Sequence, residues 1–249
     1  MRDPKARTVV PDPKLVVPAA EASPRWSALA AGRAALRRFW RPFLLIQGAA
    51  LALALGYRFS DAFRAACAVA AGWKQAGGVW FSMGSTALAG GIIPELARLL
   101  ADRSRTRWQG RGRDIAFNVV VFALDGLIVD ALYRGEARLF GAQASLGTVV
   151  AKVAFDQFVF TPPWTVLLTL IYLWPQRGYR VGATLAALGQ PFLWRRVLGI
   201  LLPNWCFWIP MVSIIYALPV PLQFLMFIPA LGAWSLIVVF IATERDDQA

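Results

Sequence analysis

Residues 204–224 read NWCFWIPMVSIIYALPVPLQF, an apolar stretch that contains prolines at positions 210, 219 and 221. In a helix of a water-soluble core, each proline would remove a backbone donor and clash with the preceding turn. Membrane helices tolerate proline because neighbouring helices and local adjustments satisfy the carbonyls that it leaves unpaired. The stretch therefore favours a membrane protein.

The composition of the whole chain agrees with this interpretation. Of 249 residues, 58% are hydrophobic and only 16% are charged, and the mean hydropathy is +0.53. Soluble domains carry about 25% charged residues. We expect an all-α polytopic integral membrane helical bundle with roughly four to six transmembrane helices. The apolar segments are 43–57, 78–97, 115–133, 148–173, 197–217 and 222–243.

Two of these segments have special features. Segment 43–57 is short for a span, so it could instead lie in the interface. Segment 148–173 contains Thr161-Pro162-Pro163, which predicts a kink or a break. The stretches 58–77 and 175–196 mix aromatic and basic residues, as interfacial helices do.

The chain divides into three parts. Residues 1–41 are basic and proline-rich, and we expect a mobile, partly amphipathic tail that lies against anionic lipid headgroups. Residues 42–243 form the helical membrane domain, and 244–249 form a short polar tail. A mitochondrial transit peptide is a weaker interpretation of the first part, because acidic residues occur in it.

The distribution of basic residues predicts the topology. With both ends of the chain on one side, that side carries 19 Lys and Arg residues, and the other side carries 5. Basic loops stay in the cytosol or its equivalent, so both termini should face the cytosol or matrix. Models with four and with six spans share this feature.

Several function classes have little support in the sequence. A net charge of +12 would suggest nucleic acid in a soluble protein, but here the arginines flank apolar segments, so no nucleic-acid partner is expected. Cys67 and Cys206 lie far apart, and the chain has no histidine. The commonest metal ligand and general base is therefore missing. We expect no cofactor, no metal and no catalytic activity.

Polar residues inside the apolar segments are the candidates for function. The third segment carries Asn118, Asp125 and Asp130, and the fourth carries Lys152, Asp156 and Gln157. Lys152 and Asp156 are four residues apart, which predicts an ion pair along one helix face. These groups could form a solute pathway, or they could only hold helices together.

A second pattern concerns small residues. Ser82, Thr86 and Gly90 follow one another at intervals of four, a spacing that permits close contact between membrane helices. Pro94 and Glu95 lie near the end of the same segment, where Glu95 could reach water. A structural role is the simpler interpretation for this face.

The central motifs resemble those of the Mpv/PMP family, which groups the 22-kilodalton peroxisomal membrane protein with a related mitochondrial inner-membrane protein. That family carries G-P-x-x-H-x-W-Y in one helix. Here Gly126 and Tyr133 keep that spacing, with Asp130 in place of the histidine and Leu132 in place of the tryptophan. The family then shows K-x-x-x-D-Q followed by proline, which is matched by Lys152, Asp156, Gln157 and Pro162.

The opening stretch resembles the C-terminal signature of the same family, N-W…W-P-x-x-Q-x-x-N-F-x-x-V-P. The matching residues are Asn204, Trp205, Trp208, Pro210 and Val220-Pro221, with one inserted residue. The departures are Ser213, Tyr216 and Ala217, where Gln, Asn and Phe are usual, and Leu225, where Arg is common. Physically, the two tryptophans suit a belt at headgroup level, and the prolines would bend the chain between the last two spans.

The resemblance, which covers roughly residues 80–242, implies a channel-like role in the permeation of small solutes or ions. The alternative is a structural or scaffolding membrane protein that transports nothing. A homo-oligomer is possible. The alanine- and arginine-rich composition favours a bacterial inner membrane, with the mitochondrial inner or peroxisomal membrane as the alternative.

Overall fold

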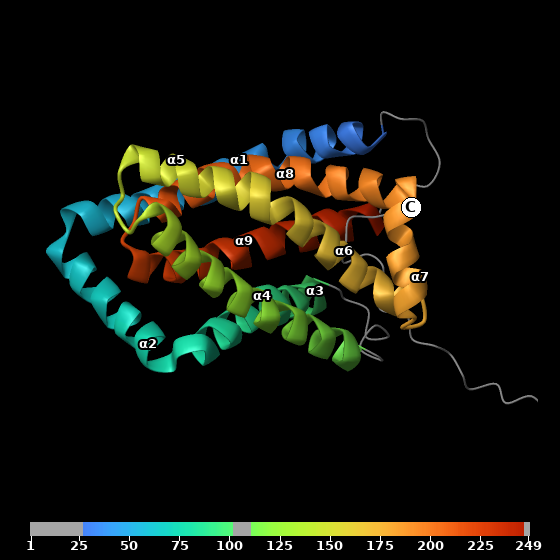
Figure 1. Ribbon diagram of the computed structural model, residues 1–249, viewed down its shortest axis with the longest axis horizontal. Helices are drawn as coiled ribbons and strands as arrows, with labels where there is room; N and C mark the ends of the chain where they lie inside the picture. The colour runs from blue at the N-terminus through green and yellow to red at the C-terminus, as the bar shows by residue number, and fades with distance from the viewer. Residues whose placement is uncertain (1–26, 102–110, 247–249) are drawn as a thin grey trace, which may run out of the picture.

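A computed structural model of the chain describes residues 27–101 and 111–246. Within these ranges every regular element is a helix (Figure 1). The predicted tail 1–41 therefore lies partly outside the described residues, as does the end of the predicted tail 244–249. The elements are α1 Ser27–Phe59, α2 Asp61–Thr86, η2 Ala87–Ile92, α3 Ile93–Ala101, α4 Arg111–Phe140, α5 Leu146–Ala154, η4 Phe155–Phe160, α6 Thr161–Gln176, α7 Val181–Leu185, η5 Ala186–Gly189, α8 Pro191–Tyr216 and α9 Val220–Asp246.

The predicted membrane bundle is confirmed. Among the described residues, six helical stretches are long and apolar enough to cross a bilayer: Trp40–Phe59, Asp61–Leu100, Gly112–Phe140, Leu146–Gln176, Pro191–Tyr216 and Val220–Ile237. The segment 43–57 is part of α1, which runs through the predicted boundary at 41/42 with Pro42 inside the helix. The protein is thus an all-α integral membrane protein.

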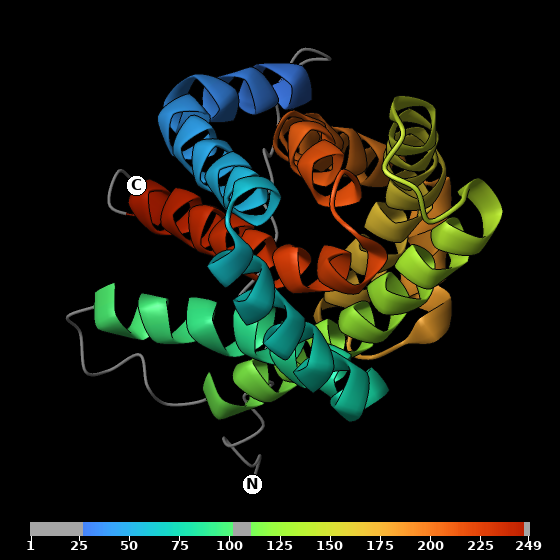
Figure 2. The same cartoon turned by 90° about the vertical axis from the view of Figure 1, so that its left-hand side faces the viewer.

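The ends of the helices sort into two groups. The start of α1, the end of α3, the start of α4, the α6–α8 connection and the end of α9 lie at one end of the bundle (Figure 1). The α1–α2, α4–α5 and α8–α9 connections lie at the other end. Viewed from that second end, α9 runs between α1 and α8 on one side and the α2–α4 helices on the other (Figure 2). An even number of spans is what the charge bias predicts, and the side that faces the cytosol stays a prediction.

The second apolar stretch is too long for a single span. Asp61–Leu100 has 40 residues, about 60 Å of helix against a hydrocarbon core of about 30 Å. The helix breaks at Gly78, whose φ of 50° and ψ of −131° are not helical. Residues 61–77 cross the end of the bundle in Figure 1, as expected for an interfacial helix, and the residues after Gly78 make the span.

A π-helical segment, η4, interrupts the fourth span just before its proline pair. At its end the Thr161 N–H bonds to the Asp156 carbonyl, five residues back. Pro162 comes next and has no N–H, so the Gln157 carbonyl lacks its backbone donor. Trp205 Nε1 of α8 donates to that carbonyl at 2.9 Å. The indole therefore replaces the donor that the proline removes.

The second span also contains a π-helical segment, η2, just before a proline. In η2 the Ile93 N–H bonds to the Leu88 carbonyl, again five residues back, and Pro94 follows. The kink or break predicted at residues 161–163 therefore takes the form of a wide π turn just ahead of the proline, and the helix continues through it. Such turns are frequent at functional sites.

Pro210 lies inside α8, which runs on without a break to Tyr216. Pro210 deprives the Cys206 carbonyl of its usual helical donor, and the next carbonyl, that of Phe207, accepts a hydrogen bond of 2.6 Å from Gln47 Nε2 of α1. A neighbouring helix thus contacts the backbone beside the proline. Pro221 lies in the first turn of α9, where a missing N–H leaves no helical bond unmade.

The two tryptophans of the predicted belt make contacts inside the bundle. Trp205 lies about 21 Å along α8 from its first residue, and Trp208 is further along the same helix. Trp208 is only 8% exposed and packs against the Phe207 and Phe227 rings, with centroids 5.2 Å and 5.6 Å away. Trp205 thus bonds to the Gln157 carbonyl, and Trp208 packs in the aromatic core.

Candidate functional site

The inward face of α4 carries polar side chains along most of its length. Asn118, Asp125 and Glu136 are 1%, 7% and 1% exposed. Facing them are polar residues of the α5–η4–α6 helix, which is connected to α4 at one end of the bundle (Figure 1). We call these facing residues the polar seam: Asn118, Asp125, Tyr133 and Glu136 with Lys152, Asp156, Thr161, Trp164 and Tyr172.

At one end of the seam, Asn118 joins three helices. Its Nδ2 donates to Glu95 Oε1 of α3 at 3.3 Å, and its Oδ1 accepts from the Tyr172 hydroxyl of α6 at 2.9 Å. Glu95 also pairs with Arg98 at 3.1 Å. Glu95 is 2% exposed, so it does not reach water as a residue near a helix end could.

In the middle of the seam, Asp125 accepts a hydrogen bond of 3.0 Å from Trp164 Nε1 of α6. The predicted alignment of Asn118 and Asp125 on one face of the helix is confirmed by their shared burial and by their contacts with the same helix, α6. The sequence did not single out their partners, Trp164 and Tyr172, because aromatic residues are common in membrane helices.

At the other end of the seam, Asp156 is held by two hydroxyls. The Tyr216 hydroxyl of α8 donates to Oδ2 at 2.8 Å, and the Thr161 hydroxyl donates to Oδ1 at 3.4 Å. Tyr216 is one of the departures from the family pattern, and here it is the main partner of the aspartate. Its ring also packs edge-on against Tyr133, with centroids 5.4 Å apart.

The predicted ion pair between Lys152 and Asp156 is not formed. Among the described salt bridges none includes Lys152, and its Nζ instead lies over the Tyr216 ring, 5.7 Å from the centroid. Asp156 is occupied instead by the Tyr216 and Thr161 hydroxyls, one on each carboxylate oxygen.

Glu136 completes this end of the seam, and the sequence analysis did not single it out. Its neighbours are Tyr216, Asp156 and Lys152. The Tyr216 hydroxyl interacts with both carboxylates but has only one proton to donate, and it bonds to Asp156 at 2.8 Å. Among the described residues, neither Glu136 carboxylate oxygen has a donor within hydrogen-bond distance. Glu136 is eleven residues from Asp125, about three helical turns, and that spacing was the available signal.

Gln157, also on η4, is 2% exposed. Its backbone carbonyl is the acceptor of the Trp205 bond, and its side chain lies beside Asp156. Its Oε1 is buried without a donor. The K-x-x-x-D-Q residues therefore do meet in one place, but around Tyr216 and Glu136 rather than around a lysine–aspartate pair.

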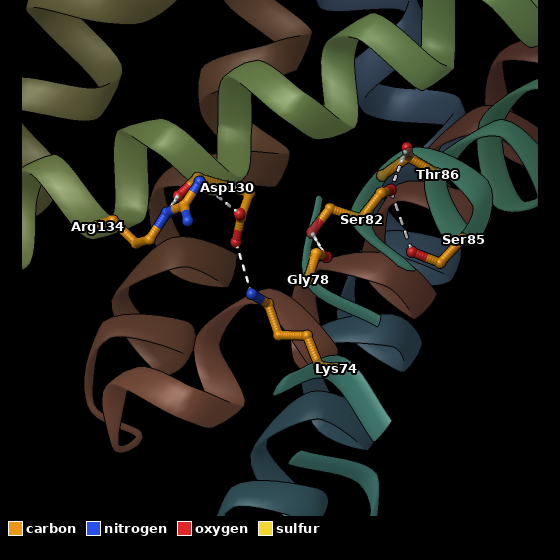
Figure 3. Close-up of polar contacts among 7 residues, drawn as sticks. All are labelled: Lys74, Gly78, Ser82, Ser85, Thr86, Asp130 and Arg134. Carbon is orange, nitrogen blue, oxygen red and sulfur yellow. Dashed lines mark hydrogen bonds and ion pairs between the residues drawn. The ribbon is translucent and has the colours of Figure 1, made fainter. Parts of the chain in front are cut away.

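Asp130 belongs to a different contact. It is 2% exposed and pairs with Lys74 of α2 at 2.6 Å and with Arg134 of its own helix at 2.9 Å (Figure 3). Lys74 lies just before the break at Gly78, so this pair fixes the interfacial arm of α2 against α4. No hydrogen bond or salt bridge described here connects Asp130 to the polar seam.

The predicted close contact of the small-residue face is confirmed. Ser82 and Thr86 are 0% exposed, and Thr86 Oγ1 donates to the Ser82 carbonyl at 2.7 Å (Figure 3). They pack against Gly126 of α4, where an added Cβ would lie 2.0 Å from Thr86 Oγ1 and 2.5 Å from the Ser82 carbonyl oxygen. A Cβ on Gly90 would likewise lie within 2.2 Å of the Phe122 ring. Gly126 therefore sets how closely α2 and α4 approach.

Among the described residues, no group of three or more His, Cys, Asp or Glu side chains is arranged to hold a metal ion. Comparisons of the chain with protein-family profiles, with curated proteins and with solved structures gave no match.

Proposed function

We propose that the protein is a channel-like integral membrane protein and that small solutes or ions permeate along the polar seam. The observation that carries the proposal is the length of the seam. Asn118 and Glu136 are roughly 18 residues apart on α4, about 27 Å of helix, which nearly matches a hydrocarbon core of about 30 Å. Polar side chains along nearly the whole of that distance are costly and are typical of substrate or ion pathways.

The chemistry of the seam favours cations and small polar solutes. Among its members, Asp125, Glu136 and Asp156 are acidic and Lys152 is basic. The hydroxyl, amide and indole groups between them offer both donors and acceptors to a solute that loses its water. Rings or rows of carboxylates select cations in channels.

The alternative, a scaffolding protein, also has a specific observation in its favour. Asn118, Asp125 and Asp156 each make hydrogen bonds to another helix, as residues that only hold helices together would. Such bonds contribute about 1 kcal/mol each in membrane proteins. Glu136 fits this reading poorly, because it shares the single Tyr216 proton with Asp156 and no described residue donates to it within hydrogen-bond distance.

Flux through liposomes reconstituted with the purified protein separates the two functions. Wild-type protein should raise the permeability to small cations or to small neutral solutes above that of protein-free liposomes. The double variant Glu136→Leu with Lys152→Met removes both charges at once, so it should fold but lose the flux. The matched control is Lys74→Met with Asp130→Leu, which also replaces a buried acid and a lysine but lies outside the seam.

The two readings predict opposite results for these variants. Loss of flux in the seam variant with retention in the control supports a pathway along the seam. Wild-type flux in a folded seam variant, or no flux from the wild-type protein itself, would refute the pathway and favour the scaffold.

A further inference from the structure

The seam end around Glu136 brings together side chains from four helical segments. Glu136 comes from α4, Lys152 from α5, Asp156 and Gln157 from η4, and Tyr216 from α8. We call these five residues the inner cluster. All are buried, with Glu136 and Lys152 each 1% exposed and Asp156 6% exposed.

The charges of the inner cluster do not balance. Two carboxylates face one ammonium group, so the formal surplus is one negative charge. The ammonium group of Lys152 lies over the Tyr216 ring and forms none of the described salt bridges. A charge left uncompensated away from water is strongly unfavourable, so the surplus calls for a positive partner.

The hydrogen bonds show where that partner would be held. Asp156 is occupied by the Tyr216 and Thr161 hydroxyls. The Tyr216 hydroxyl also interacts with Glu136, but its single proton bonds to Asp156. Among the described residues, three buried oxygens of the inner cluster therefore have no donor within hydrogen-bond distance: Glu136 Oε1, Glu136 Oε2 and Gln157 Oε1. Acceptor oxygens without donors suit a cation and cannot satisfy an anion.

We infer that the inner cluster is a binding site for one exchangeable monovalent cation, a proton or Na⁺, held by the Glu136 carboxylate beside Asp156 and Gln157. This inference deepens the proposed function, because it names the class of ion that the seam would carry. Transporters hold Na⁺ and protons where a membrane helix departs from regular geometry and offers oxygens to the ion. Here the departure is the π-helical segment η4, which supplies both Asp156 and Gln157.

Lys152 gives the site a second property. It faces the same carboxylates without pairing with them, so its positive charge opposes an incoming cation. A site in a permeation path must release its ion as well as bind it. Lys152 therefore weakens binding and keeps the cation exchangeable.

The test measures cation binding by the purified full-length protein in detergent, apart from any flux. Thermal unfolding is followed in NaCl and in choline chloride at equal ionic strength, and separately from roughly pH 5 to roughly pH 8. We expect the melting temperature of the wild-type protein to depend on Na⁺ or on pH, and Glu136→Gln to lose that dependence. A Na⁺ response assigns the site to sodium, and a pH response alone assigns it to the proton.

Two further variants keep the result interpretable. Asp61→Asn removes an exposed carboxylate at the start of α2 and should leave the dependence intact. Lys152→Met removes the opposing charge, so it should tighten cation binding and lower the concentration needed for half the stabilisation. A residue with only a structural role would not produce such a gain, so this variant also serves if Glu136→Gln does not fold.

The inference is overturned if the wild-type melting temperature responds to neither Na⁺ nor pH beyond the response of Glu136→Gln, or if Lys152→Met leaves the binding unchanged. The outcome is separable from the proposed function. Binding without flux in liposomes refutes the pathway and keeps the site, whereas flux without binding refutes the site and keeps the pathway.

Discussion

Replacing Gly126 by alanine should destabilise the protein through a single added methyl group. The new Cβ would lie 2.0 Å from Thr86 Oγ1 and 2.5 Å from the Ser82 carbonyl oxygen. The hydroxyl could move, but the carbonyl is backbone in the middle of α2, so the two helices must separate. Overpacking of this kind costs about 1–3 kcal/mol. Equilibrium unfolding in mixed detergent micelles measures the loss.

Two companion variants identify the cause of the loss. Gly135→Ala lies on the same helix with nothing within 4 Å of its Cβ, so it should gain up to about 1 kcal/mol from helix propensity. Thr86→Ala combined with Gly126→Ala removes the closer of the two clashes and should recover part of the stability. If Gly126→Ala is as stable as the wild-type protein, the tight approach of α2 and α4 does not exist and the reasoning fails.

Three other results are expected. Gln47→Leu should cost about 0.5–1.5 kcal/mol of stability, because the hydrogen bond that joins α1 to α8 is lost, and an unchanged unfolding curve would contradict this. Trp205→Phe should destabilise the wild-type protein more than it destabilises the Pro162→Ala variant, because in that variant the backbone N–H of residue 162 can donate to the Gln157 carbonyl. A double-mutant cycle that shows no coupling between the two residues would refute this replacement of one donor by the other. Single cysteines near the two ends of the chain, in a background without native cysteines, should be labelled from the same side of the membrane, and opposite labelling would rule out an even number of spans.

Hydropathy was sufficient to predict the spans, but it misplaced the end of α4. The apolar pattern stops at Tyr133 because Arg134 and Arg138 follow, and both arginines are exposed. The helix nevertheless continues to Phe140, and between the two arginines Glu136 points inward. A hydropathy average over a window of residues counts all three charged residues as polar surface, whereas only the two arginines are on the outer face of the helix.

The seam was predicted in part. Asn118 and Asp125 are aligned as a regular helix requires, so their shared face could be inferred from spacing alone. The pairing of Lys152 with Asp156 failed because the Tyr216 hydroxyl, from another helix, and the Thr161 hydroxyl occupy the aspartate. Contacts between helices, such as that of Tyr216 with Asp156, depend on how the spans pack, which a single sequence does not specify.

The bond between the Trp205 indole and the Gln157 carbonyl has an evolutionary consequence. The indole fills a role that exists only because Pro162 cannot donate, so neither residue has the same value without the other. A lineage that loses the proline gains a backbone donor, and the indole N–H must then compete for an acceptor in a region with few to spare. Residues 162 and 205 should therefore change together in evolution. A relative without proline at position 162 should have an aromatic residue without an N–H group, such as phenylalanine, at position 205.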